Sequence, residues 1–187
     1  MRTILVPLNV DAAMPPGGSS LFTTAGTSMG TTWSARLMLP PGADGAVLTA
    51  ALQSELDEIV AQMSHWDADS LLSRYNRAPA GSWHALPPQF FAVAEYALQV
   101  AADSGGAYDP AAGALVDLWG FGARRRYDQP GFQAPQAGLV DAFLARRVER
   151  QPVLDQAGRR LLQPGGAILD FSSVAKGYAV DRMAACL

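Results

Sequence analysis

The sequence is poor in cysteine and histidine, with one cysteine, Cys186, and two histidines among 187 residues. A single cysteine excludes an internal disulfide and a cysteine-rich metal site. Lysine and arginine number 14 against 17 for aspartate and glutamate, and the sequence shows no basic stripe of the kind that nucleic-acid binding needs. We therefore expect no nucleic-acid partner.

Long apolar runs are also missing. No run approaches the roughly 20 residues that a membrane-spanning helix requires, so no transmembrane segment is expected. Residues 1–19 contain neither a secretory apolar region of adequate length nor a cysteine for lipid attachment, which leaves the cytoplasm as the default expectation. Prolines and glycines gather in residues 11–20 and indicate a linker. We interpret residues 1–19 as an extension before one domain over residues 20–187.

The composition is that of a globular protein, because 49% of the residues are hydrophobic and 17% are charged. The mixture of strand and helix patterns along the chain predicts an α+β fold. Alternating apolar residues predict strands, and apolar stripes with a period of 3.6 predict helices. The expected strands cover residues 2–6, 20–25, 31–39, 151–155, 158–163 and 167–171. The expected helices cover residues 44–63, 87–103, 135–148 and the stretch from Val174 onward, with a short helix through Tyr75 that Asp69 or Ser70 caps. Prolines and glycines predict a loop over residues 79–88.

The stretch over residues 165–185 carries the strongest signal of chemistry. A short apolar run interrupted by Asp170 precedes a helical pattern, with Ser172 or Ser173 as the expected N-cap. A strand that enters a helix N-terminus forms an anion site, because free N–H groups and the positive end of the helix dipole face the ligand. Lys176 adds a positive charge there. An ordinary capped helix with an exposed lysine fits the same spacing equally well.

Several other positions allow both a structural and a functional interpretation. Met29 stands in a turn, where filling a gap in the core is the simpler explanation. Trp66 lies in a polar segment and either stacks on an aromatic ligand or packs over the edge of the core. Asp109 precedes a proline and is an expected helix N-cap, or it binds a polar ligand edge. His65 and His84 are interpreted as structural loop residues.

Four motifs follow one another in the chain: TSMGTTW at 27–33, MSHWDADSLLSRYN at 63–76, SGGAYDPAAGALVDLWGFG at 104–122 and LDFSSVAKGYAVDRMA at 169–184. In this order they resemble the ApbE family of flavin transferases, also called FAD:protein FMN transferases. The resemblance implies an ApbE-like, T-fold-related α+β fold with a mixed sheet and packed helices. It also implies an enzyme that uses Mg²⁺ to move FMN from FAD onto a threonine or serine of an acceptor flavoprotein, with release of AMP.

The resemblance also assigns FAD contacts by matched position. The positions are Met29, Trp66, Ala107, Tyr108, Asp109, Asp170 and Lys176. Within this set, Met29 and Trp66 would contact the flavin ring, while Asp170 and Lys176 would hold the nucleotide. Ser173 falls where the family supplies a metal ligand, and it would bind Mg²⁺. The resemblance assigns no catalytic base to this chain.

The chain departs from the family pattern at its C-terminal end. It stops at Leu187, inside an amphipathic helix, whereas members of the family continue well beyond this helix. We therefore expect a truncated, N-terminal portion of a flavin transferase domain. Two other functions stay open: a non-catalytic flavin- or nucleotide-binding module, and a hydrolase that splits FAD into FMN and AMP.

Overall fold

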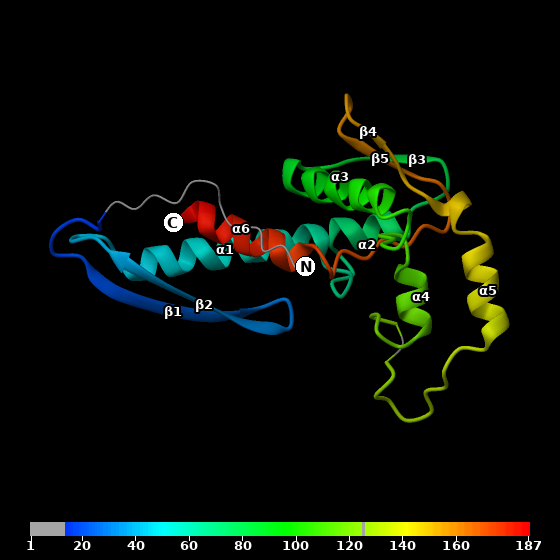
Figure 1. Cartoon of the computed structure of the whole chain (residues 1–187), viewed down its shortest axis with the longest axis horizontal. Helices are drawn as coiled ribbons and strands as arrows, with labels where there is room; N and C mark the ends of the chain where they lie inside the picture. The colour runs from blue at the N-terminus through cyan, green and yellow to red at the C-terminus, as the bar shows by residue number, and fades with distance from the viewer. Residues whose placement is uncertain (1–13, 125) are drawn as a thin grey trace.

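The computed structural model describes residues 14–124 and 126–187, so the strand predicted over residues 2–6 lies outside the described residues. The chain is elongated: the hairpin and two helices form one end, and a small sheet with the remaining helices forms the other (Figure 1). The elements in chain order are β1 (Ser20–Ser28), β2 (Thr31–Leu39), α1 (Gly45–Met63), α2 (Leu71–Asn76), β3 (Ser82–Ala85), α3 (Pro88–Asp103), α4 (Gly113–Leu118), α5 (Ala137–Ala145), η1 (Val148–Arg150), β4 (Val153–Asp155), β5 (Arg160–Gln163) and α6 (Ala175–Cys186).

β1 and β2 form the antiparallel hairpin that the alternating pattern predicts. β1 runs three residues farther than predicted, because only Met29 and Gly30 form the turn, with φ values of 51° and 72°. Two-residue turns with positive φ at both positions match the twist of the flanking strands. The ring of Trp33 occupies the space that a side chain on Gly26 would need, and its Nε1 donates to Gln53 Oε1 at 3.0 Å. This bond fixes the hairpin against α1.

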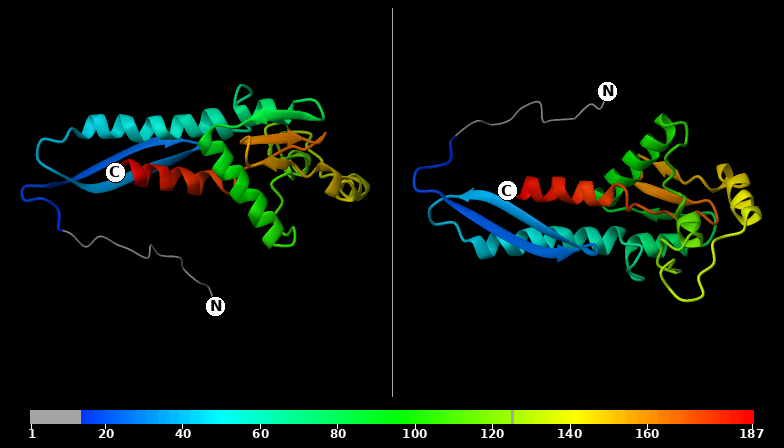
Figure 2. Two further views of the ribbon diagram at one scale, coloured as in Figure 1. Left: turned by 90° about the horizontal axis from the view of Figure 1, so that it is seen from above. Right: turned by 60° about the horizontal axis from the view of Figure 1, so that its bottom comes forward.

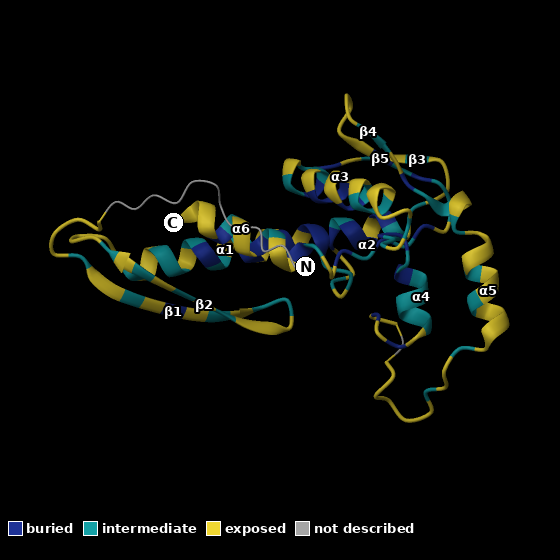
Figure 3. Cartoon of the chain, viewed as in Figure 1, coloured by how far each residue is buried: buried dark blue, intermediate teal, exposed yellow. Residues whose placement is uncertain are grey.

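The hydrophobic core lies where α1, α2 and α3 meet residues 167–171, and the dark blue residues of Figure 3 gather at this junction. α1 is capped by Asp44, which accepts a hydrogen bond from the Ala46 N–H at 2.7 Å, and it buries most of its predicted apolar stripe. Phe90 of α3 packs edge-on against Phe171, with ring centroids 5.7 Å apart. The core therefore anchors the segment that the sequence motifs single out.

A second sheet has the strand order β3-β5-β4, with antiparallel pairing throughout. The β4–β5 hairpin confirms the hairpin predicted from residues 151–163. The prediction of a loop over residues 79–88 is wrong, because residues 82–85 form β3. This strand pairs with β5 from a distant part of the chain, and strand formation depends strongly on such partners. The single helix predicted over residues 135–148 is observed as α5 followed by the short 3₁₀ helix η1.

Ala167, Leu169 and Phe171 are buried, but residues 167–171 do not form the strand that their apolar run predicts. Within the described residues they make one isolated parallel bridge, between Ala112 and Ile168. Asn76 supplies the hydrogen bonds that a neighbouring strand would give: its Nδ2 donates to Leu169 O at 2.9 Å, and its Oδ1 accepts from the Leu169 N–H at 2.8 Å. A side-chain amide therefore satisfies the buried backbone here.

Two predicted helix caps are also wrong. α6 begins after Val174, and neither serine before it caps the helix; the Ser172 hydroxyl donates to Asp170 instead. α4 begins farther along the chain than predicted, after a turn in which Asp109 accepts from the Ala111 N–H at 2.9 Å. Asp109 therefore caps a turn and not a helix. α2, in contrast, is capped by Ser70, one of the two predicted residues.

α6 lies alongside α1, as the two views of Figure 2 show. Arg182 Nη2 of α6 is 2.8 Å from Glu55 Oε2 of α1, and Ala175, Ala179 and Met183 are buried between α6 and its neighbours. This arrangement confirms the amphipathic helix predicted after Val174. Among the described helices, none combines the length and the apolar character that crossing a membrane requires.

Candidate functional site

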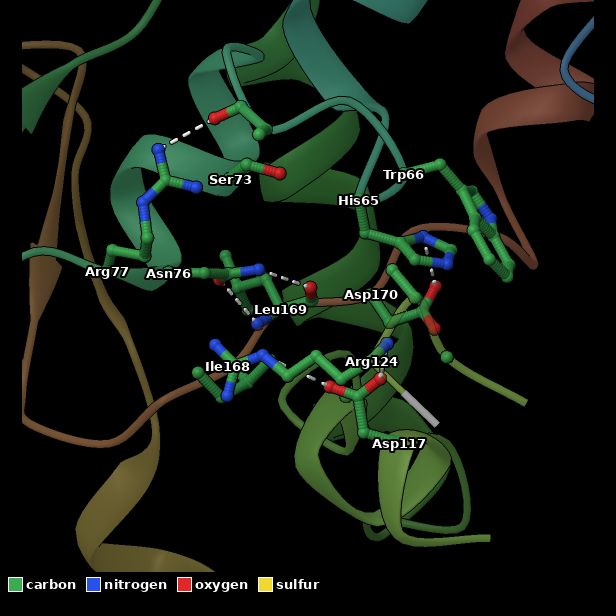
Figure 4. Close-up of a pocket in the computed structure, with 14 residues that line it drawn as sticks. His65, Trp66, Ser73, Asn76, Arg77, Asp117, Arg124, Ile168, Leu169 and Asp170 are labelled. Carbon is green, nitrogen blue, oxygen red and sulfur yellow. Dashed lines mark hydrogen bonds and ion pairs between the residues drawn. The ribbon is translucent and has the colours of Figure 1, made fainter. Parts of the chain in front are cut away.

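Two neighbouring cavities share His65 and Trp66 as lining residues. The larger, polar cavity has a volume of about 180 Å³ and is drawn in Figure 4. Its other lining residues are Ala68, Ser73, Asn76, Arg77, Gly113, Asp117, Gly122, Ala123, Arg124, Ile168, Leu169 and Asp170. The smaller, apolar cavity has a volume of about 70 Å³. Its other lining residues are Met29, Ile59, Val60, Met63, Ser64, Phe171, Ser172, Ala175 and Lys176.

The polar cavity combines charges of both signs. Arg77 Nη2 donates to Ala68 O at 2.7 Å, and Arg124 Nε lies 3.8 Å from Asp117 Oδ2. Asp170 borders the same space (Figure 4), and its side chain is only 14% exposed. Guanidinium groups bind phosphate oxygens, and carboxylates accept hydrogen bonds from hydroxyl and amine groups. The cavity therefore suits a ligand that carries both phosphate and sugar or base groups.

Asp170 is oriented by its own segment before any ligand arrives. Its N–H donates to Pro110 O at 2.9 Å, which ties it to the turn before α4. Its Oδ1 accepts from the Ser172 N–H at 2.7 Å and from the Ser172 hydroxyl at 2.5 Å. The preceding residue, Leu169, is held by the amide of Asn76. A carboxylate fixed in this way is suited to a binding site, because little conformational entropy is lost when the ligand binds.

The apolar cavity brings together residues from three distant parts of the chain. Met29 comes from the β1–β2 turn and Trp66 from the loop after α1. Phe171 comes from the segment before α6, and Lys176 from the first turn of α6. A non-glycine residue with positive φ, such as Met29, is uncommon, and such strain is often found at functional positions. Trp66 is 56% exposed, so its ring is accessible to a ligand and is not enclosed by the core.

Three predicted site residues, Ala107, Tyr108 and Asp109, line neither of these two cavities. Ala107 is exposed, while Asp109 Oδ2 accepts from Arg147 Nε at 3.0 Å. Arg147 also donates to Gly106 O, so it binds the turn before α4 at two points. Asp109 therefore joins the turn before α4 to the segment after α5. No local signal in the sequence points to Arg147 as the partner.

Ser173, the predicted metal ligand, lies beside Tyr108. The Ser173 hydroxyl donates to the phenol oxygen of Tyr108 at 3.4 Å, and burial raises the pKa of that phenol above its ordinary value. Within the described ranges, no three histidine, cysteine, aspartate or glutamate side chains gather into a group that could hold a metal ion. Mg²⁺ prefers six oxygen ligands and usually one or two carboxylates. The described residues alone therefore do not fit a complete Mg²⁺ site.

Sequence reasoning places His65 among structural loop residues, but the structure places it in the wall of both cavities. Its Nδ1 lies 3.7 Å from Asp170 Oδ1, and its ring centroid lies 5.0 Å from that of Trp66. Its Nε2 is buried and has no hydrogen-bond partner in the part of the chain that the structure describes. The position next to Trp66 was the only hint in the sequence.

Comparison with known proteins settles the family. The model of the ApbE family matches residues 29–187, which is most of the chain. The chain belongs to the ApbE family. It is 31% identical over 179 residues to the FAD:protein FMN transferase of Klebsiella pneumoniae (strain 342), covering 93% of this chain and 50% of that relative. It is 32% identical over 165 residues to the FAD:protein FMN transferase of Escherichia coli (strain K12), covering 85% and 45%.

The fold of this ApbE-family chain is also that of a solved relative. The structure of the flavin transferase ApbE from Vibrio cholerae matches it with a TM-score of 0.80 and 30% sequence identity, over 89% of this chain and 53% of that one. This likeness confirms the predicted ApbE-like α+β fold. The chain spans about half the length of the curated relatives it matches.

Proposed function

We infer that this ApbE-family chain carries the FAD-binding part of an FAD:protein FMN transferase. The observation that supports this most directly is the pair of cavities that share Trp66. The apolar cavity, with Met29 and an accessible tryptophan ring, suits the flavin ring system. The polar cavity, with Arg77 and Asp170, suits the phosphates and the adenosine half. Lys176 stands beside the apolar cavity, where its charge can meet the first phosphate.

The proposed reaction moves the FMN half of FAD. The hydroxyl oxygen of a threonine or serine in an acceptor flavoprotein bonds to the phosphorus of that half, and its proton is released to solvent. The pyrophosphate bond breaks, and AMP leaves with the bridging oxygen. In this proposal the described residues bind and orient FAD, and Ser173 offers one neutral oxygen to Mg²⁺. No step through the metal is assigned to this chain, because the described residues do not complete a site for it.

One observation favours a second candidate, a non-catalytic flavin-binding module. The cavities supply stacking and charged groups, while within the described residues no cluster of three metal-ligating side chains is present. A module of this kind would bind FAD and leave the pyrophosphate intact. The two candidates share the binding step, so ligand preference is the first property to measure.

We expect FAD to bind the chain about tenfold more tightly than ATP, because stacking of the flavin ring adds roughly 1–3 kcal/mol that adenosine phosphates cannot gain in the apolar cavity. Isothermal titration calorimetry with FAD, FMN, ADP and ATP measures this directly. FMN should occupy the apolar cavity and ADP the polar one, each more weakly than FAD. If ATP binds as tightly as FAD, the flavin assignment is wrong.

Replacement of Trp66 by alanine should weaken FAD binding by about 1–3 kcal/mol, the range measured for base stacking on aromatic side chains. Trp66→Tyr should retain most of the affinity, because a phenol ring still stacks. Trp83→Ala is the matched control: Trp83 is 43% exposed but lies on β3, away from both cavities. Calorimetry and quenching of flavin fluorescence give the affinities. Equal affinities for wild type and Trp66→Ala would mean that Trp66 only covers the edge of the core.

A further inference from the structure

His65 combines two properties that a structural loop histidine rarely has. It lines both cavities, and its side chain is 16% exposed with one ring nitrogen left without a hydrogen bond among the described residues. Buried polar atoms are nearly always hydrogen-bonded, because an unpaired one forfeits its contacts with water. The other histidine, His84, follows that rule, since its Nε2 lies 2.9 Å from Ser82 Oγ.

The neighbours of His65 decide which ring nitrogen carries the proton. Nδ1 lies 3.7 Å from Asp170 Oδ1 and 3.5 Å from Ser172 Oγ. The carboxylate can only accept, and the Ser172 hydroxyl proton already points at Asp170 Oδ1 at 2.5 Å. Both neighbours of Nδ1 are therefore acceptors, so we assign the proton of the neutral ring to Nδ1. Nε2 is left with a lone pair, and it needs a hydrogen-bond donor.

The place of His65 defines which part of a ligand could supply that donor. It lines both the apolar cavity, with Met29 and Trp66, and the polar cavity, with Asp170. Figure 4 shows its ring between Trp66 and Asp170. In FAD, the ring system and the phosphates are joined by the ribityl chain, whose hydroxyl groups are donors. Phosphate oxygens at pH 7 only accept, so they cannot satisfy Nε2 in this protonation state.

We propose that His65 is a substrate-contacting residue whose Nε2 accepts a hydrogen bond from a ribityl hydroxyl of the bound flavin. This inference rests on the proposed function, because it takes FAD as the ligand of the two cavities. His65 then fixes the flavin at the junction between ring and phosphate. It also makes the site select flavins that carry a ribityl chain.

Binding of four ligands distinguishes the ribityl contact of His65 from contacts with the flavin ring and with the adenosine half. FAD and riboflavin carry the ribityl chain, lumiflavin has the ring system without it, and ADP has neither. The variant His65→Phe keeps a ring of similar shape but has no acceptor. This variant should bind FAD and riboflavin about tenfold more weakly, because one polar group of the ligand is left unpaired. Its affinities for lumiflavin and ADP should change less than about twofold.

Two further variants test whether Nε2 of His65, and not Nδ1, accepts the hydrogen bond. The amide oxygen of His65→Gln reaches near the Nε2 position and should restore most of the riboflavin affinity, whereas the shorter His65→Asn reaches only the Nδ1 position and should not. His84→Phe is the control for removing a histidine elsewhere in the fold, and it should leave all four affinities unchanged. Circular dichroism verifies that each variant is folded.

The outcomes are distinguishable from those of the proposed function. The FAD affinity of the unsubstituted chain is measured first, and no binding there overturns the flavin assignment together with this inference. If the chain binds FAD and His65→Phe binds riboflavin like wild type, the ribityl contact is wrong while the proposed function stands. If His65→Phe lowers the affinity for lumiflavin as much as that for riboflavin, His65 packs against the flavin ring, and the proposed ribityl contact is again wrong.

Discussion

Residues 1–187, incubated with FAD, Mg²⁺ and an acceptor flavoprotein, should form FMN adduct at least about a thousandfold more slowly than a full-length relative, because a metal ion supplies several kcal/mol of transition-state stabilisation. Phosphoryl transfer depends almost entirely on positioning and on neutralising charge at the transferred group. Ser173 offers one neutral oxygen, and within the described residues no three ligating side chains lie together. The chain also spans only about half of the relatives it matches.

The same protein should still bind FAD, since both cavities are formed by described residues. Mass spectrometry of the acceptor after incubation detects the adduct, and calorimetry on the same preparation verifies that FAD is bound. The full-length Klebsiella relative serves as the positive control. Adduct formation at the rate of that control would show that a working metal site is complete within this chain.

The hairpin and the long helices could be predicted because their signals are local. The alternation in β2 and the apolar stripes of α1 and α3 each mark one face of the element. In the structure that face is the less exposed one. The turn was predicted in the right place but too wide, because Gly26 has the look of a turn residue and yet pairs within the hairpin. These elements needed no knowledge of their distant partners.

The elements that the sequence did not reveal depend on partners far along the chain. β3 becomes a strand only through β5, and residues 167–171 stay irregular because Asn76 occupies the place of a neighbouring strand. The pairing of Asp109 with Arg147 is of the same kind. Local patterns carry no information about such partners, so a buried apolar run looks like a strand whichever group satisfies its backbone.

The motifs marked some of the residues that line the two cavities, while other marked positions, such as residues 107–109, line neither. The resemblance to the family singled out Met29, Trp66, Asp170 and Lys176, and the structure gathers these four residues at two neighbouring cavities. His65 has no such mark, because its significance comes from its position beside a carboxylate on another segment. The roles of all these residues in binding FAD stay predictions until the affinities are measured.

The second large effect is expected at Asn76, which links the core to the site. Its amide holds both backbone groups of Leu169, a residue that is 2% exposed. Asn76→Ala leaves this buried N–H and C=O without partners, at a cost of roughly 1–3 kcal/mol each, so the free energy of unfolding should fall by about 2–6 kcal/mol. Because Asp170 follows directly, its carboxylate should lose its fixed orientation, and FAD affinity should fall as well.

Urea denaturation of Asn76→Ala, Asn76→Asp and wild type measures this loss. Asn76→Asp keeps an acceptor for the Leu169 N–H but turns a carboxylate oxygen toward the Leu169 carbonyl, so it should also destabilise the fold while allowing one of the two bonds. Arg74→Ala, on the exposed side of the same helix, is the control and should change the free energy of unfolding by less than about 0.5 kcal/mol. If Asn76→Ala is as stable as that control, then residues 167–171 hold their shape through apolar packing and their other backbone hydrogen bonds. The Asn76 amide would then be a consequence of the fold, and Asp170 would owe its orientation to Pro110 and Ser172.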